Sequence, residues 1–244
     1  MAAGIASGFI TAILQTKMGI NSLLAGIIVN TGLYSINIAV MSGSSILNMN
    51  KTDTVFTKMA ALVKGTPVAR QSKLFVAIIA VAAVAVILGL FLKTRLGLAI
   101  RATGDNPDMV RSSSVNPAFT TIIGLCVANS FTALSGCLLA QSQRSVNIDI
   151  GTGMVTIALA SLLIGGVFLG RKKMPLRIFG MVLGAFIFRL IYTIALRFDM
   201  PAFMLKFVSS VIVIAAIATP YFKKQLPLLK RRIQTRSGRR KADA

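Results

Sequence analysis

The sequence predicts an all-α fold: a polytopic bundle of transmembrane helices, with about six full spans and a short apolar helix near the N-terminus. Three observations support this. Of the 244 residues, 55% are hydrophobic, more than a single globular core of this length needs. Lys and Arg number 27 against 6 acids, and a soluble nucleic-acid binder does not combine such charge with such hydrophobicity. Long uncharged stretches also alternate with basic clusters, as in membrane-spanning chains.

The missing residue types limit the chemistry. All six acids are Asp, and the chain has no Glu, His or Trp. A membrane-embedded enzyme would therefore have only Asp, Tyr, Ser, Lys and Arg for acid–base work, so we expect no catalytic residue and no metal site. Cys126 and Cys137 are separated by about 16 Å on one helix, too far for a disulfide, and we interpret them as small apolar residues.

The helices are predicted from uncharged stretches close to the roughly 20 residues that cross a bilayer. Residues 1–14 are apolar but short, and no basic residue precedes Lys17, so this segment is not a secretory signal. We expect a truncated or interfacial helix there. Full spans are predicted at residues 20–41, 74–92, 117–140, 153–170, 178–196 and 201–222. Together, residues 1–222 form the predicted transmembrane domain.

Clusters of Lys and Arg predict which connections are cytoplasmic. Segments 93–111 and 171–177 carry four basic residues each, and the tail at 223–244 carries nine against one acid. If these three basic segments are cytoplasmic, connections 141–152 and 198–201 face outward. Connection 42–72 then also faces outward, although it carries four basic residues. The tail is predicted to contact anionic lipid headgroups. We do not expect nucleic-acid binding, because no aromatic residues are interleaved in it.

Two pairs of glycines have the small-xxx-small spacing that lets helix backbones approach closely. They are Gly4 with Gly8 and Gly180 with Gly184. Packing within the chain is the favoured interpretation, and a dimer seam is the alternative.

The connection at residues 93–116 has mixed polarity and a helix-start signal. Asn106 can cap a helix whose first residue is Pro107, so we predict a short helix at 107–114 lying along the membrane face. The alternative is a plain cytoplasmic connection.

This connection also carries a family resemblance. Residues 97–107 have the sequence Gly-Leu-Ala-Ile-Arg-Ala-Thr-Gly-Asp-Asn-Pro, and Ser114-Val115-Asn116 follows. The stretch resembles the cytoplasmic loop of permeases of the branched-chain amino acid and ribose-type ABC importers. Residues 128–141 and 150–165 resemble the next helices of that family. Residues 17–26 and 33–37 resemble its amino-acid uptake branch.

The chain departs from the family at two points that matter here. Ser114 stands where the family usually has Gly, so we expect a less sharply turned end to the docking helix. The chain also begins at the equivalent of a third span, as if the family's N-terminal spans were lacking. A non-transporting, truncated permease is therefore one alternative, and a secondary transporter or channel is another.

The resemblance implies a permease subunit that moves a small polar solute, most simply an amino acid, across the cell membrane. A separate ATP-binding subunit would hold ATP and Mg²⁺, since no G-x-x-x-x-G-K-[ST] motif occurs in the chain, and no cofactor is expected here. An extracytoplasmic solute-binding protein and a second permease copy are the other implied partners. The implied ATPase-coupling residues are Arg101, Ala102, Gly104, Asp105, Asn106, Pro107, Arg111 and Val115.

Polar groups inside spans are candidates for the solute pathway, because such groups are costly in lipid. Arg189 lies in the middle of a predicted span. The other candidates share one predicted helix and are Asn129, Ser130, Ser135 and Gln141. Hydrogen bonds between helices explain the polar groups on that helix equally well, and structural pairing or snorkelling explains Arg189. The outward connection at 141–152 would be a docking site for the binding protein or a solvated loop.

Overall fold

The computed structural model describes residues 1–50, 52–62, 72–151, 154–169 and 174–197, and the single positions 204, 207, 210, 211, 214 and 218. The chain divides into two compact units, Met1–Asp149 and Ile150–Ala244, and each is considered by itself. Most of the predicted span at 201–222, and all of the tail at 223–244, lie outside the described residues.

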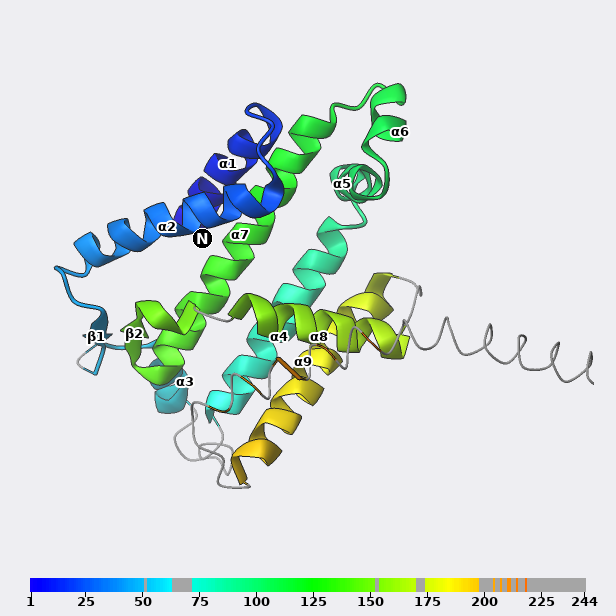
Figure 1. Ribbon diagram of the computed structural model, residues 1–244. Coiled ribbons are helices and arrows are strands. Elements are labelled where there is room, and N and C mark those ends of the chain that lie inside the picture. Colours follow the sequence, from blue (N-terminus) through cyan, green and yellow to red (C-terminus); the bar gives the residue numbers. More distant parts are fainter. Residues whose placement is uncertain are drawn as a thin grey trace, which may run out of the picture. The chain divides into compact units, whose positions relative to one another are not determined.

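The first unit contains seven helices and two short strands among its described residues (Figure 1). In chain order these are α1 (Ala2–Thr16), α2 (Ser22–Val40), β1 (Ile46–Asn48), α3 (Val55–Leu62), α4 (Ser72–Phe91), α5 (Arg95–Asp105), α6 (Pro107–Ser112), α7 (Pro117–Gln143) and β2 (Ser145–Asn147). A 3-10 turn, η2 (Ile148–Gly151), leads out of this unit. The described part of the second unit has α8 (Met154–Leu169) and α9 (Met174–Arg197).

Four described helices are long and apolar enough to cross a membrane: α2, α4, α7 and α9. They correspond to the spans predicted at 20–41, 74–92, 117–140 and 178–196. The helix found at the predicted span 153–170 is α8, which has 16 residues and a length of about 24 Å, short of a 30 Å hydrocarbon core. The predicted helical membrane bundle is therefore confirmed, with α1 and α8 as shorter apolar helices.

Connection 42–72 contains structure that the sequence did not predict. Strand β1 pairs antiparallel with β2, with Ile46 opposite Asn147 and Asn48 opposite Ser145. The ribbon extends by one bond, from the Met49 amide to the Arg144 carbonyl oxygen (2.9 Å). An all-α fold is thus correct for the spans and omits this small ribbon, whose strands come from connections far apart in the sequence.

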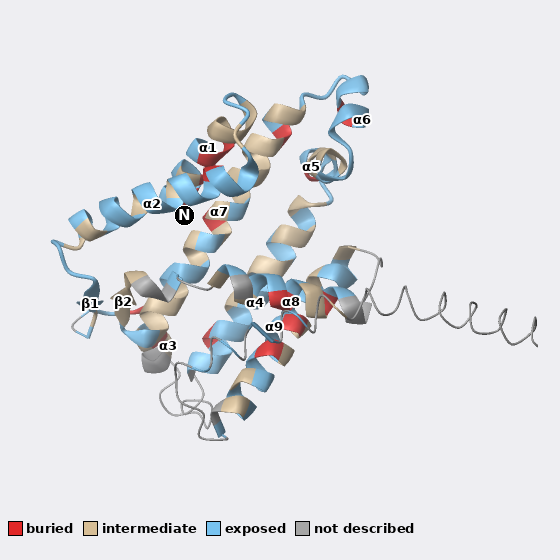
Figure 2. Cartoon of the chain, viewed as in Figure 1, coloured by how far each residue is buried: buried red, intermediate tan, exposed pale blue. Residues whose placement is uncertain are grey.

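Helix α1 packs along α7 and runs antiparallel to it (Figures 1 and 2). A Cβ on Gly4 would overlap the backbone of Asn129, and a Cβ on Gly8 would lie 2.6 Å from the Leu125 carbonyl oxygen. The two backbones are in contact only because both positions are glycine. The truncated or interfacial helix that the sequence predicts is thus a short apolar helix that lies along α7.

The second glycine pair has the same role in the second unit. Gly184 of α9 sits against the Ser161 backbone of α8, and a Cβ on Gly184 would come 2.7 Å from the Gly165 nitrogen. A Cβ on Gly165 would in turn overlap the Gly180 backbone. Both small-xxx-small pairs therefore pack helices within the chain, as the favoured interpretation predicts.

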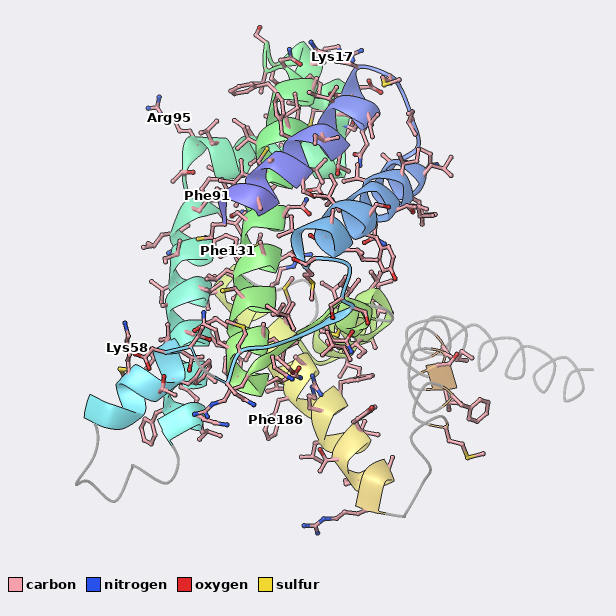
Figure 3. All side chains as sticks on the ribbon, turned by 90° about the vertical axis from the view of Figure 1, so that its left-hand side faces the viewer. Lys17, Lys58, Phe91, Arg95, Phe131 and Phe186 are labelled. Carbon is pink, nitrogen blue, oxygen red and sulfur yellow. The ribbon has the colours of Figure 1, made fainter. Side chains whose placement is uncertain are left out.

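The 27 residues of α7 give the first unit two ends separated by about 40 Å. Helices α5 and α6 lie at the Pro117 end, and the β1–β2 ribbon lies at the Gln143 end. Figure 3 shows Lys17 and Arg95 at one end of this unit and Lys58 at the other. The ribbon residues 46–48 and 145–147 therefore lie at the end of this unit opposite the segment 93–116.

Candidate functional site

The segment between α4 and α7 folds as two helices. Helix α5 begins after Thr94, whose hydroxyl oxygen accepts a hydrogen bond from the Gly97 amide (3.2 Å). Gly97 fits closely against the end of α4, since an added Cβ would lie 2.6 Å from the Leu92 Cα. The sequence prediction missed α5; the signal for it was the capping Thr94 before a run of helix-compatible residues.

Asn106 ends α5 and begins α6. Its side-chain oxygen accepts hydrogen bonds from the Asp108 amide (3.1 Å) and the Met109 amide (3.2 Å), and Pro107 is the first helical residue. The predicted helix start is confirmed. The helix itself ends at Ser112, two residues before the predicted 114.

Ser114 makes the turn that leads from α6 toward α7. Its φ is +60°, in the left-handed region. Its amide donates to the Arg111 carbonyl oxygen (3.2 Å) and the Val115 amide donates to the Val110 carbonyl oxygen (3.2 Å), the two bonds of a Schellman ending. The expectation of a less sharply turned end is therefore wrong. Serine adopts the conformation that suits glycine, at an energetic cost.

A hydrogen bond between a half-buried and a buried hydroxyl joins α5 to α7. The Thr103 and Thr120 hydroxyl oxygens are 2.7 Å apart, and Thr120 is 1% exposed. Each hydroxyl also lies near a backbone acceptor of its own helix, Ala99 for Thr103 (2.8 Å) and Pro117 for Thr120 (2.9 Å). One hydroxyl can thus donate to the other while that partner donates to its own helix. The sequence prediction did not identify this pair, since a spacing of 17 residues has no recognisable pattern.

The predicted coupling residues form a largely exposed surface on these helices. Those that are exposed are Arg101, Gly104, Asp105, Asn106, Pro107, Arg111 and Val115, whereas Ala102 is half-buried. The guanidinium groups of Arg101 and Arg111 and the carboxylate of Asp105 form no ion pair within the described chain. Val110 is 4% exposed and anchors α6 from its inner side. The surface therefore presents unpaired charges of both signs.

Three of the four candidate pathway residues on α7 have partners within the first unit. The Asn129 amide donates to the Leu125 carbonyl oxygen (3.0 Å), and the buried Ser130 hydroxyl donates to the Val127 carbonyl oxygen (2.9 Å). The Gln141 side-chain oxygen accepts a bond from the Val55 amide (3.0 Å), the first residue of α3. Ser135 is exposed. Gln141 therefore caps α3, and Asn129 lies at the contact with α1.

Arg189 belongs to α9 in the second unit and is exposed there. It follows Phe188, which is 1% exposed, stacks on Tyr192 with ring centroids 6.4 Å apart, and lies on the same face as Gly184. Arg189 is turned about 100° away from that face. Its contact with solute, like its structural pairing or snorkelling, stays a prediction.

A family profile described as a branched-chain amino acid transport system permease component matches residues 1–217. A tyrosine transport system permease protein of Clostridioides difficile (strain R20291) is 32% identical over 88% of this chain and 69% of its own length. An uncharacterized protein of Rickettsia prowazekii (strain Madrid E) is 29% identical over 67% of this chain and 55% of its own.

A more distant similarity is to an autoinducer 2 import system permease protein, LsrC, of Yersinia enterocolitica, which is 23% identical over 88% of this chain and 56% of its own length. The chain thus spans between 55% and 69% of the length of these three relatives. No solved structure matches. The profile covers most of the chain, including every described helix from α1 to α9, and the chain belongs to the family of permease components of branched-chain amino acid transport systems.

Proposed function

We propose that this multi-pass membrane protein is the permease subunit of an ATP-driven importer, and that α5 and α6 dock on a separate ATP-binding subunit. One observation carries the docking proposal: the two helices present unpaired charges outward, while Thr103 and Thr120 bond the inner side of α5 to α7 and Val110 is buried on the inner side of α6. A surface that is exposed on one side and rigidly held on the other suits the transfer of a partner's movement.

The contacts of α5 support a route from the docking surface to two spans. Thr103 and Thr120 connect α5 to α7, and the Ile100 side chain lies 3.2 Å from the position of a Cβ on Gly124 of the same span. Gly97 fits α5 against the end of α4. A displacement of α5 would therefore shift the ends of α4 and α7 together. ATP hydrolysis would take place wholly on the partner, since the sequence contains no phosphate-binding motif.

The docking surface sets the orientation that we propose. With α5 and α6 in the cytoplasm, the β1–β2 ribbon lies outside, because it is at the other end of α7. An extracytoplasmic solute-binding protein would meet the permease at that outer end, and the C-terminal tail would be cytoplasmic. A second copy of the chain would complete the transport unit.

The transported solute is proposed to be an amino acid. Support comes from the family description and from the relative whose name specifies tyrosine transport. Gln141 is bonded to α3, Asn129 lies at the contact with α1 and Ser130 is buried. We therefore keep Ser135 and Arg189 as the candidates on α7 and α9 for contact with solute.

The test of the docking proposal is co-purification of the ATP-binding subunit with the permease. Reversal of two charges, Arg101→Glu with Asp105→Lys, is expected to reduce co-purification and amino-acid uptake at least tenfold, because both groups are exposed and would face partner charges of the opposite sign. The control for co-purification is Arg144→Glu, an exposed charge at the outer end. Equal loss of co-purification in both variants, or in neither, contradicts docking at α5 and α6.

A further inference from the structure

Helix α2 carries a row of polar side chains without partners. Asn30, Tyr34 and Asn37 are spaced i, i+4 and i+7, which places them within an arc of about 60° on one helix face. All three side chains are exposed, Tyr34 by 46%. None forms a hydrogen bond through its side chain within the part of the chain that the structure describes. We call Asn30, Tyr34 and Asn37 the polar row.

The polar row points away from the packed face of α2. Ala25 is the buried residue of this helix, with 0% exposure, and it lies about 140° around the helix from Asn30. The packing of α2 in its own unit therefore does not cover the polar row. The side opposite the row carries exposed apolar side chains, among them Ile28, which is 52% exposed, together with the small polar Ser35.

The other two candidate spans of the first unit, α4 and α7, have no comparable row of polar side chains among their described residues. The exposed side chains of α4 between Leu74 and Phe91 are all apolar, which suits contact with lipid. On α7, Asn129 and Gln141 are hydrogen-bonded within the unit. Leaving two amides and a phenol in hydrocarbon without partners would cost several kcal/mol. The polar row therefore needs an environment that supplies hydrogen bonds.

The position of the row along α2 indicates what that environment is. Asn30 is near the middle of the helix, and Asn37 lies close to the end that leads to β1, about 10 Å further along the axis. The row thus extends from the end of the span that carries the ribbon to the centre of the membrane. In the orientation proposed above, this is the outer half, where an importer receives its solute.

We propose that the polar row lines the outer half of the solute pathway and contacts solutes without net charge. This inference rests on the proposed function. Amide and phenol groups donate and accept hydrogen bonds, and they are neutral polar groups. They suit the ammonium, carboxylate and side-chain hydroxyl of a zwitterionic amino acid, and they offer no counter-charge to a solute with a net charge.

The experiment is cysteine labelling of the full chain in membrane vesicles. Asn30, Tyr34 and Asn37 are replaced singly by Cys in a background of Cys126→Ala and Cys137→Ser. The matched controls are Ile28→Cys, at nearly the same depth on the other side of α2, and Val86→Cys on the lipid-facing α4, where the side chain is 60% exposed. A charged methanethiosulfonate reagent is added from either side, with or without L-tyrosine or L-lysine as solute probes.

We expect labelling of the three row positions at least tenfold faster than of Ile28→Cys and Val86→Cys, and slower labelling in the presence of L-tyrosine than of L-lysine. Equal rates at row and control positions overturn the proposal. So does disulfide formation between two copies at position 34, which would make the row a contact between permeases. Labelling needs no ATP-binding subunit. A failure of ATP-driven uptake would therefore contradict the proposed function. The labelling rates would still test, independently, whether the polar row lines a solute pathway.

Discussion

Helices α4 and α7 are both candidate spans of the first unit, and they differ in length, in hydropathy and in the contacts that they make. Helix α4 is the more apolar of the two, and Val76 is its one buried residue with a described side chain. Helix α7 is less apolar, yet it contacts α1, α3, α5, α6 and β2. The span with the stronger hydropathy signal is thus the one that makes fewer contacts in its unit.

The difference teaches how helices associate where lipid surrounds them. Lipid tails are as apolar as Leu, so an apolar surface gives a helix no preference for protein over lipid. The contacts of α7 are made instead by glycines of α1, by hydroxyls from α5 and by a side-chain amide that caps α3. Breaking each type of contact in turn tests whether α7 organises the unit, with α4 as the reference.

The largest effect is expected at the glycine contact. A Cβ at position 8 would lie 2.9 Å from the Cys126 Cα, so Gly8→Leu forces α1 away from α7 and is expected to cost about 3 kcal/mol of stability. The measurement is the midpoint of thermal unfolding of the purified protein in detergent.

Gly136→Leu is the control for that substitution. It lies on α7 itself, where an added Cβ meets no atom within 4 Å. We expect an unchanged midpoint there, as for Val86→Ala on α4. A similar fall in both glycine variants would show that α7 is sensitive to any bulk and that the contact with α1 is not special.

The spans and the glycine contacts were predictable because each depends on a local pattern. An uncharged run of about 20 residues or a glycine spacing of four is visible in the sequence, and Asn106-Pro107 is a recognisable helix start. The family resemblance supplied the coupling residues. The ribbon was not predictable, because Ile46 and Asn147 gain their structure only from each other. The capping of α3 by Gln141 likewise depends on a residue 86 positions away.

The next largest effect is expected at the link between Thr103 and Thr120. Thr103→Val and Thr120→Val keep the side-chain shape and remove a hydroxyl, and each is expected to cost about 1 kcal/mol. In the double variant the cost should be less than the sum, because the same bond is lost only once. If the link transmits movement, solute uptake falls more than ATP hydrolysis by the assembled importer.

Thr121→Val is the matched control for the hydroxyl link. The Thr121 hydroxyl donates to the Pro117 carbonyl oxygen (2.8 Å) within α7 and makes no bond to α5. Uptake and ATP hydrolysis should stay in the wild-type ratio. Loss of that ratio in Thr121→Val, or additive costs for Thr103 and Thr120, would contradict a specific link between α5 and α7.

A smaller and more local effect is expected at the other end of α7. Gln141→Leu removes the acceptor for the Val55 amide, and the first turn of α3 then exchanges its amide hydrogens faster, by about fivefold for a loss near 1 kcal/mol. The exposed Gln143→Leu is the control and should leave this exchange unchanged. Unfolding midpoints should hardly change, in contrast to Gly8→Leu. Unchanged exchange in Gln141→Leu would show that α7 does not stabilise α3 through this hydrogen bond.

The smallest effect is expected where the chain turns from α6 toward α7. Ser114→Gly relieves a left-handed backbone at φ +60° and is expected to stabilise the turn by about 0.5 kcal/mol, seen as slower hydrogen exchange of the Val115 amide. Ser113→Gly is the control: its φ of −87° gives glycine no advantage, so exchange there should become faster. Slower exchange in Ser114→Gly together with faster exchange in Ser113→Gly would show that backbone conformation sets this turn. If both variants change the exchange rate in the same direction, the contact of α6 with α7 holds the turn instead. The organising role of α7 would then extend to the docking helices themselves.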